Sequence, residues 1–280
     1  MLPVHNRAAT TLSFARCLTR QELRDWRLIL IDDGSTDGTA AAVLKEIPGA
    51  TVLRGDGRLW WAGSLQKGYE WLSRAGADPE SAVLIINDDT EFGPDFLSNG
   101  LKILGENPDS LLLARCFSKQ TGKLIEVGTH VDWRRFKFEQ ADESRELNCL
   151  STRGLFLRTK DFLALGGFHP RLLPHYASDY EFTIRAHRRG FKLVCDPRLN
   201  LSVDESTSGY HGIEDSEKSL FRMLKKKFFS IKTPANPFYW TAFLLLACPW
   251  PWKFVNIIKI WFGTVKSIAY LIKLRIRKRL

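Results

Sequence analysis

Several common sequence signatures are missing from this chain of 280 residues. Its five cysteines are odd in number, and no two of them form a CxxC pair. We therefore expect a reducing compartment, and neither a disulfide framework nor a structural zinc site. There is no GxGxxG turn after the first predicted strand and no GxxxxGK[ST] loop, which argues against nicotinamide-binding and P-loop proteins. No apolar stretch precedes the first polar residues, so we expect no signal peptide.

Acidic residues are absent from the last part of the chain. Residues 218–280 contain 14 Lys and Arg and no Asp or Glu. Residues 1–217 therefore carry 27 basic and 31 acidic residues, although the whole chain has a net charge of +10. Because the positive charge belongs to the C-terminal segment, we expect no nucleic-acid partner for the rest of the chain. The length allows one large domain, or one domain with an appendage.

The stretch from Val83 to Thr90 combines a buried strand with a polar end. Four large apolar residues, 83–86, are followed directly by Asn87, Asp88 and Asp89. Ligands of open α/β sheets bind beyond the carboxyl ends of the strands. A divalent cation that carries substrate phosphates would suit such a cluster of oxygen ligands. The alternative is a solvated turn, because Asn and Asp are common turn formers.

The preceding residues alternate between strand and helix patterns. A second strand pattern also ends in two acids, Asp32 and Asp33, which are followed by a glycine turn. This alternation predicts a parallel sheet with right-handed crossovers. In chain order, the predicted elements are a helix over 10–24, a strand over 26–31, a helix over 40–46, a strand over 50–53, a helix over 64–75 and the strand over 83–86.

Four pieces in this order resemble family 2 of the inverting glycosyltransferases, which have the GT-A fold. The pieces are Pro3–Arg7, Asp32–Asp37, Asn87–Thr90, and Ser178–Phe182 with Arg185 and Gly190. The segments Trp60-Trp61 and Gly154–Leu157 resemble the bacterial branch that builds cell-surface polysaccharides, and Asn87 in the first motif position is also seen in rhamnosyltransferase-like members. The resemblance implies an α/β, Rossmann-like, mostly parallel sheet flanked by helices over residues 1–215, with a C-terminal amphipathic helical tail over 216–280.

The resemblance also implies a donor site. Asp32 and Asp33 would lie near the base and ribose of a sugar nucleotide. Asp89 would bind Mg²⁺ or Mn²⁺ together with the diphosphate, and His211 would make a late metal or phosphate contact for which Asp204 competes. The other positions that match the family's donor-binding pieces are Pro3, Val4, Asn6, Arg7, Asn87 and Asp88.

Asp179 is the catalytic base that the resemblance implies, because it lies six residues before Arg185. Ser178 and Glu181 replace the acids that flank the base in the family's usual motif. The alternative for Asp179 is a helix cap, since an acid at a helix start is favoured by the helix dipole, and the two roles can coexist. Arg153 or Arg185 could assist the diphosphate.

The pattern of residues in the tail predicts a helix that lies on a membrane surface. The apolar run 238–247 is too short to span a bilayer. The longer run 254–276 carries Asn256, Lys259, Lys266 and Lys273 along one stripe, which is typical of an interfacial helix on anionic lipid. The alternatives are a helix that packs back on the domain and a re-entrant pair around Pro249–Pro251.

These observations predict a hexosyltransferase at the cytoplasmic face of the membrane, attached peripherally. It would be inverting and metal-dependent, and would transfer a sugar from a nucleotide-sugar donor to a hydroxyl of a glycan or lipid-linked acceptor. The alternatives are a Mg²⁺-dependent nucleotidyltransferase and a catalytically inactive sugar-nucleotide-binding or scaffold protein. The second alternative arises because only Met1 and Leu2 precede the Pro3 piece, so we expect either a start further upstream or a compromised first strand.

Overall fold

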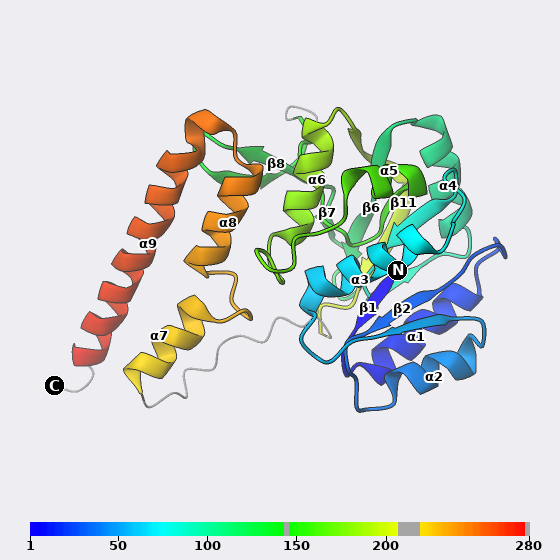
Figure 1. Cartoon of the computed structure of the whole chain (residues 1–280), viewed down its shortest axis with the longest axis horizontal. Helices are drawn as coiled ribbons and strands as arrows, with labels where there is room; N and C mark the ends of the chain where they lie inside the picture. The colour runs from blue at the N-terminus through cyan, green and yellow to red at the C-terminus, as the bar shows by residue number, and fades with distance from the viewer. Residues whose placement is uncertain (143–145, 207–218, 278–280) are drawn as a thin grey trace.

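The computed structural model describes residues 1–142, 146–206 and 219–277. An α/β body holds the sheet, and the C-terminal helices stand beside it (Figure 1). The strands are β1 (Leu2–Val4), β2 (Ile29–Asp32), β3 (Thr51–Arg54), β4 (Ala82–Ile85), β5 (Thr90–Phe92), β6 (Ser110–Ser118), β7 (Leu124–Glu126), β8 (Thr129–Asp132), β9 (Lys137–Gln140), β10 (Leu155–Arg158) and β11 (Lys192–Val203). The helices are α1 (Ala8–Thr19), α2 (Thr39–Glu46), α3 (Trp60–Arg74), α4 (Phe96–Glu106), α5 (Thr159–Leu165), α6 (Ser178–Arg188), α7 (Leu220–Phe229), α8 (Pro237–Ala247) and α9 (Trp250–Arg277).

The first half of the sheet is parallel, as the alternating pattern predicts. Strands β1, β2 and β3 pair in parallel in the order β1-β2-β3. Met1 joins them to β4, because its ammonium donates to the carbonyl oxygen of Leu84 at 2.7 Å and its own carbonyl accepts from the N–H of Ile86 at 3.2 Å. The polar ends of β1, β2 and β4 therefore meet at one edge.

The prediction of a mostly parallel sheet is wrong for the second half. Here the order is β4-β10-β6-β11-β5, and β10 runs antiparallel to both β4 and β6. Strand β5 is antiparallel to β11, whereas β6 and β11 are parallel. The reversal arises because the chain leaves β6 through the short strands β7 to β9 instead of a crossover helix. The sheet is therefore mixed.

Helices cover both faces of the sheet. One buried cluster packs β1, β2 and the even-numbered residues of β6 against α1, α2 and α4, and the other packs the opposite faces against α3, α5 and α6. Successive residues of β6 divide between them, with Leu112 in the first cluster and Leu113 in the second. Strands buried on both faces need continuous apolar runs, which explains Leu111–Ala114 and Val83–Ile86.

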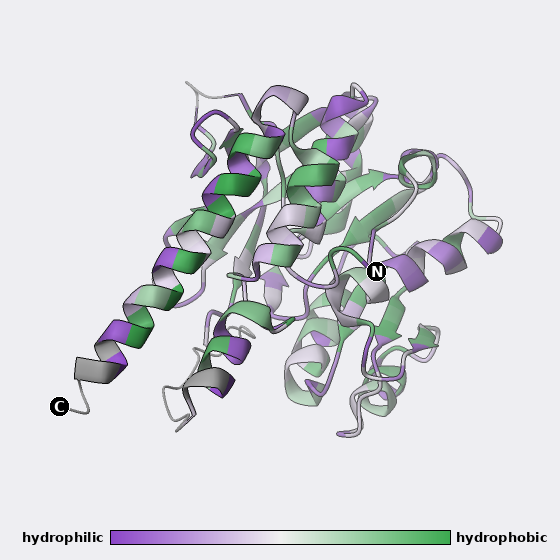
Figure 2. Ribbon diagram, turned by 60° about the vertical axis from the view of Figure 1, so that its left-hand side comes forward, coloured by the Kyte–Doolittle hydropathy of each residue, from purple (hydrophilic) through white to green (hydrophobic). Residues whose placement is uncertain are grey.

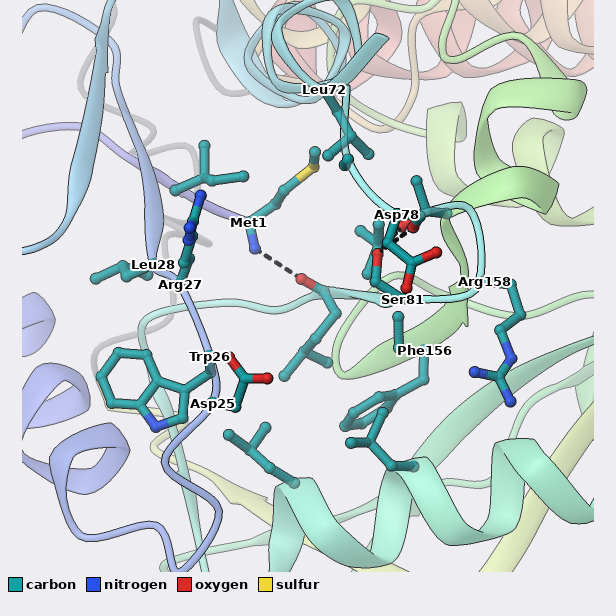
Figure 3. A pocket seen from close by; sticks show the side chains of 18 of the residues that line it. Met1, Asp25, Trp26, Arg27, Leu28, Leu72, Asp78, Ser81, Phe156 and Arg158 are labelled. Carbon is teal, nitrogen blue, oxygen red and sulfur yellow. Dashed lines mark hydrogen bonds between the residues drawn. The ribbon is translucent and has the colours of Figure 1, made fainter. Parts of the chain in front are cut away.

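A cavity of about 740 Å³ lies beside Met1, at the N-terminal ends of β2 and β4. Figure 3 shows the Met1 ammonium in this cavity, with Trp26, Arg27 and Leu28 on one side and Ser81 and Phe156 on the other. Burial lowers the pKa of the ammonium to about 5, because the charged form is poorly solvated there.

Strand β1 forms and pairs with β2 despite its length of three residues.

The C-terminal helices add a third buried cluster. Phe243 and Leu244 of α8 pack with Ile184 of α6 and Val131 of β8. Helix α9 follows α8 as the second arm of a hairpin, and the Trp261 indole donates to the hydroxyl of Thr241 at 3.0 Å. Hydrophobic and hydrophilic residues alternate along α9 in Figure 2.

The expected lysine stripe of α9 is only partly correct. Asn256 is buried and donates to the carbonyl oxygen of Trp133 at 2.7 Å, and its own amide oxygen accepts from Lys259 Nζ at 3.2 Å, so this part of the stripe faces the body of the protein. One face of α9 packs on α8, and the other still exposes large apolar side chains. The helix is therefore only weakly amphipathic, because apolar residues occupy both faces.

Candidate functional site

The turns after β1 and β2 are joined by side-chain to backbone hydrogen bonds. The N–H of Asn6 donates to the hydroxyl of Ser35 at 2.9 Å, and the Asn6 amide oxygen accepts from the N–H of Thr36 at 2.8 Å. Asn6 itself has a positive φ of 51°, a conformation that asparagine tolerates better than most residues. The Pro3–Arg7 piece and the Asp32–Asp37 piece therefore form one surface at the strand ends.

Asp33 organises the loop that precedes α3. One oxygen accepts from the N–H of Gly57 at 2.8 Å, and the other accepts from the N–H groups of Leu59 and Trp60 at 2.9 and 3.1 Å. Gly34 must be glycine, because a Cβ there would lie 2.7 Å from the backbone nitrogen of Gly57. The structure thus places Asp33 at the expected edge and shows it shaping the loop, while its contact with a nucleoside stays a prediction.

Asp32 lies at the same edge and is buried at the end of β2. One of its oxygens accepts from the N–H of Ser35 at 2.9 Å, which fixes the turn. The proposed contact between Asp32 and a nucleoside likewise stays a prediction.

Asp88 ties the end of β4 to the N-terminus of α1. Arg7 Nε donates to both of its oxygens, at 2.9 and 3.0 Å, and the Thr11 hydroxyl donates to one of them at 2.7 Å. Burial raises the pKa of Asp88, and the Arg7 guanidinium opposes this shift. Arg7 and Asp88 therefore hold the strand ends together.

Asp89 differs from Asp88 in its partners. Its Oδ1 is buried and has no hydrogen-bond partner among the described residues, and its Oδ2 lies 3.8 Å from Arg7 Nη2. A buried carboxylate oxygen without a donor is costly unless a cation or another donor satisfies it. The Asp89 carbonyl oxygen also accepts from the N–H of Asp204 at 2.9 Å, so β11 ends beside it.

A divalent metal fits Asp89 if the substrate supplies further oxygens. Within residues 1–142, 146–206 and 219–277, no three His, Cys, Asp or Glu side chains are grouped to hold a metal. His211, the other predicted ligand, lies outside the described residues. Magnesium and manganese commonly bind through one or two carboxylates plus substrate phosphates, which suits a single buried carboxylate at a strand end.

A cavity of about 640 Å³ connects the end of β4 with the start of α6. Asn87 lines it at one end, Arg153 and Glu126 line its wall, and Asp179 lies at the first turn of α6. The structure thus brings together Asn87 and Asp179, which are 92 positions apart in the sequence.

Asp179, the base that the family resemblance implies, lies in the first turn of α6 and lines the cavity. The residue before α6 that takes the cap position is Ala177, in a left-handed conformation with φ 62°, and no side chain caps this helix start. The N–H of Tyr180 donates to Asp179 Oδ1 at 2.9 Å. Burial raises the pKa of Asp179 to about 6, nearer to neutrality than that of an ordinary aspartate.

Of the two candidate arginines, Arg153 is the one that lines the cavity. Its Nη1 lies 3.6 Å from a Glu126 oxygen, and its buried Nε has no hydrogen-bond partner among the described residues. Burial disfavours the charged form of Arg153, but the carboxylates of Glu126 and Asp89 outweigh this and raise its pKa. Arg153 is therefore a charged group that interacts electrostatically with both Asp89 and Asp179.

Arg185 has a different role. It pairs with the buried Glu181, at 2.8 and 3.0 Å, and donates to the carbonyl oxygens of Gly167 and Leu165. These bonds fix the loop between α5 and α6, so the guanidinium is engaged in structure and not turned to the cavity.

Sequence reasoning missed most of the residues that line this cavity. They come from α3, β7, β8, β9, α6, α8 and the loops between these elements, and no linear motif groups them. Only the folded chain brings these positions together. The missed lining residues include Glu126, Phe138, His175 and Trp240, whereas Trp61 and Tyr180 lie in segments that carry the family resemblance.

Comparisons with known proteins agree on family and fold. The sequence profile described as Glycosyl transferase family 2 matches residues 1–164, more than half of the chain. Asp179 lies beyond this range, so its assignment depends on the cavity geometry. No curated protein sequence matches the chain significantly.

Solved structures share the fold at low sequence identity. S. aureus TarS 1-349 in complex with UDP-GlcNAc has a TM-score of 0.58 and 16% identity, over 80% of this chain and 62% of that chain. A second structure of S. aureus TarS 1-349 has a TM-score of 0.56 and 17% identity, over 72% of this chain and 59% of that chain. GalNAc-T7 with UDP, GalNAc and Mn²⁺ has a TM-score of 0.59 and 14% identity, over 89% and 50%. The matched part is thus less than two thirds of each of these chains.

Proposed function

Because the chain belongs to glycosyl transferase family 2, we propose that it transfers a sugar from a nucleotide-sugar donor to a hydroxyl of a glycan or lipid-linked acceptor. The reaction we propose is metal-dependent and inverts the configuration of the transferred sugar. The observation that carries the proposal is the cavity that extends from Asn87, two residues before Asp89, to Asp179. A metal-binding carboxylate and a base with a raised pKa then serve two ends of one reaction.

The strand-end edge is the proposed donor site. It combines the turns after β1 and β2 with the buried Asp89 at the end of β4. Structural neighbours were crystallised with UDP, UDP-GlcNAc or UDP and Mn²⁺, which supports a nucleoside diphosphate and a divalent metal here. Asp89 would hold the Mg²⁺ or Mn²⁺, and the bound metal would offset the negative charge of the leaving diphosphate.

The chemistry of the protein side chains follows from the cavity. Asp179 accepts the proton of the acceptor hydroxyl while the acceptor oxygen bonds to the anomeric carbon of the donor. The bond from that carbon to the diphosphate breaks, and the Arg153 guanidinium stabilises the charge that develops. One direct displacement inverts the configuration at this carbon, so a single base is sufficient.

A screen of nucleotide sugars tests the proposal. We expect one nucleoside diphosphate sugar to bind by calorimetry, with clearly higher affinity when Mn²⁺ is present, because Asp89 would hold the metal and the metal would offset the charge of the diphosphate. The same sugar 1-phosphate without the nucleoside should bind far more weakly, since it lacks the contacts of the strand-end turns. Absence of binding throughout the screen, or release of pyrophosphate in place of a nucleoside diphosphate, would contradict the proposal.

We also propose that α9 attaches the protein to the cytoplasmic face of an anionic membrane. Its outer face exposes Phe254, Ile258, Phe262 and Val265, which are 53%, 68%, 71% and 62% accessible. These residues lie at helical spacings of three and four, so they share one stripe. Among the described residues, Trp250–Lys273 is also the one helix that is long and apolar enough to span a bilayer. Only 11% of its most apolar stretch is buried in the protein.

The lysines favour a helix that lies on the surface. Lys259 and Lys266 fall within the apolar segment and both are exposed; Lys259 also donates to the carbonyl oxygen of Arg134 at 3.0 Å. Each charged residue at the centre of a bilayer costs about 2.5–3.5 kcal/mol on insertion scales. At an interface the same side chains reach anionic headgroups, and each contributes about 1 kcal/mol of attraction.

Liposome co-sedimentation measures this attachment. The full-length protein should sediment with anionic vesicles, and high salt should release it only in part, because salt does not screen the apolar stripe. Replacing Phe254, Ile258 and Phe262 with serine should weaken vesicle binding by about tenfold or more, because each substitution removes apolar area that the membrane would bury. Leu172→Ser, which alters a similarly exposed apolar residue of the body, is the matched control and should bind normally.

Two outcomes would contradict surface attachment. If the full-length chain remains in the supernatant with anionic vesicles, α9 is a packing or oligomerisation element. If only detergent extracts it, the helix penetrates the bilayer.

A further inference from the structure

One wall of the catalytic cavity is aromatic. Phe138 of β9 lies between Tyr180 of α6 and Trp240 of α8, with ring centroids 5.7 Å from each of them. The Phe138 and Tyr180 rings are nearly parallel, at 19°. All three residues line the cavity of about 640 Å³, and all three remain partly exposed to it. We call Phe138, Tyr180 and Trp240 the aromatic wall.

The aromatic wall is held rigidly from behind. The Trp240 indole donates to the carbonyl oxygen of Pro234 at 2.6 Å, and the side chains of Tyr180 and Thr129 are hydrogen-bonded. Behind the wall, Phe243 is fully buried and packs edge-on against Trp240 at 5.4 Å. A fixed apolar surface loses little conformational entropy when a ligand binds to it.

Polar atoms that still need partners lie in the same cavity. His175 Nδ1 and Arg153 Nε are buried and have no hydrogen-bond partner among the described residues. Buried polar atoms are normally hydrogen-bonded, so each of these favours a ligand with hydroxyl groups. Burial lowers the pKa of His175, and a neutral imidazole can either donate to a hydroxyl or accept from one.

This combination matches a sugar ring. A pyranose has an apolar face of C–H groups and an edge of hydroxyls, and the cavity offers flat aromatic rings beside polar atoms. Its volume also falls within the range of small-molecule sites. The aromatic wall adjoins Asp179, because Tyr180 is the next residue, and its elements β9, α6 and α8 contribute nothing to the donor edge at β1, β2 and β4.

We propose that the aromatic wall binds a pyranose ring of the acceptor glycan and presents its hydroxyl to Asp179. This inference rests on the proposed glycosyl transfer and names the acceptor class of the same site. It also makes α8 part of the site, since Trp240 comes from the C-terminal segment. The helix hairpin therefore does more than anchor the protein, because α8 faces the acceptor while α9 faces outward.

Saturation-transfer NMR on the full-length protein tests the proposal. The probes are four methyl glycosides, of glucose, galactose, rhamnose and N-acetylglucosamine, each measured with UDP or dTDP and Mg²⁺. We expect the ring C–H protons of at least one glycoside to receive saturation. Trp240→Leu and Phe138→Leu should each weaken this binding about tenfold, because an aromatic contact is lost, and should leave the nucleotide signals unchanged.

Trp133→Leu is the matched control. Trp133 stacks on Phe243 at 6.0 Å in the same buried cluster, but it does not line the cavity. The control should lose a similar amount of thermal stability and keep full glycoside binding. Should Trp240→Leu fail to fold, Phe138→Leu and Tyr180→Leu carry the same test.

The outcomes separate this inference from the proposed function. If a nucleotide binds but no glycoside does, or if Trp240→Leu and Phe138→Leu both bind glycosides like the wild type, the acceptor wall is refuted and the donor site stands. If no nucleotide sugar of the screen binds, the proposed glycosyl transfer fails, and the inference that rests on it fails as well.

Discussion

Replacing Asp179 with asparagine should reduce turnover by about 10²–10⁴-fold, the usual effect of losing a positioned general base. Asparagine keeps the shape of the side chain but cannot accept the proton of the acceptor hydroxyl. Donor affinity should stay nearly unchanged, because the proposed donor site lies at the strand ends. Steady-state kinetics on the purified variant, with donor binding measured separately by calorimetry, gives both quantities.

The pH dependence gives Asp179 a second readout. Since burial raises its pKa to about 6, turnover should rise with pH through about 6 as the carboxylate loses its proton, and the Asn variant should lack this inflection. Asp161→Asn is a matched control, because Asp161 is a buried carboxylate with a raised pKa in the first turn of α5. A collapse of donor affinity in Asp179→Asn would instead make Asp179 a binding or structural group.

Replacing Asp89 with asparagine should abolish measurable transfer, a loss of at least about 10²–10³-fold, which is the scale for removing one group that stabilises developing charge. The fold should survive, because Oδ1 makes no hydrogen bond among the described residues and the site lies at a strand end. Donor binding should also lose its dependence on Mn²⁺. Titration of the metal in the presence of the donor measures this change.

Asp88→Asn provides the contrast. Asp88 accepts from Arg7 and Thr11, so its replacement should lower the free energy of unfolding by about 1–3 kcal/mol, as expected when buried partners lose their acceptor. Its metal titration should resemble that of the wild type. Unchanged turnover and metal dependence in Asp89→Asn would refute the metal assignment.

Local sequence was a good guide to the donor edge. The runs 29–32 and 82–85 form strands within three residues of the predicted bounds; the first ends at Asp32, and the second is followed by Asp88 and Asp89. Parallel strands joined by helices must end at the same edge, so the motifs after β2 and β4 were expected to meet, and they do. Helix α1 ends at Thr19, earlier than predicted, because periodicity locates the ends of an element poorly.

The different roles of Asp88 and Asp89 could not be read from the motif. Adjacent acids look equivalent in sequence, yet side chains of successive residues point to different sides of the backbone. Asp88 turns towards Arg7 and Thr11 of the first turn and helix, whereas one oxygen of Asp89 has no such partner. Contacts across about 80 positions make this distinction.

The cavity around Asp179 also combines features that the local sequence predicts with features that depend on tertiary packing. The family resemblance predicts Asp179 as the base through its spacing to Arg185, and the basic, apolar composition of the last 63 residues distinguishes the tail. The antiparallel course of β10, the enclosure that raises the pKa of Asp179, and the place of Trp240 in the cavity wall all depend on long-range packing. Periodicity reports which residues are buried, but it does not say which partner buries them.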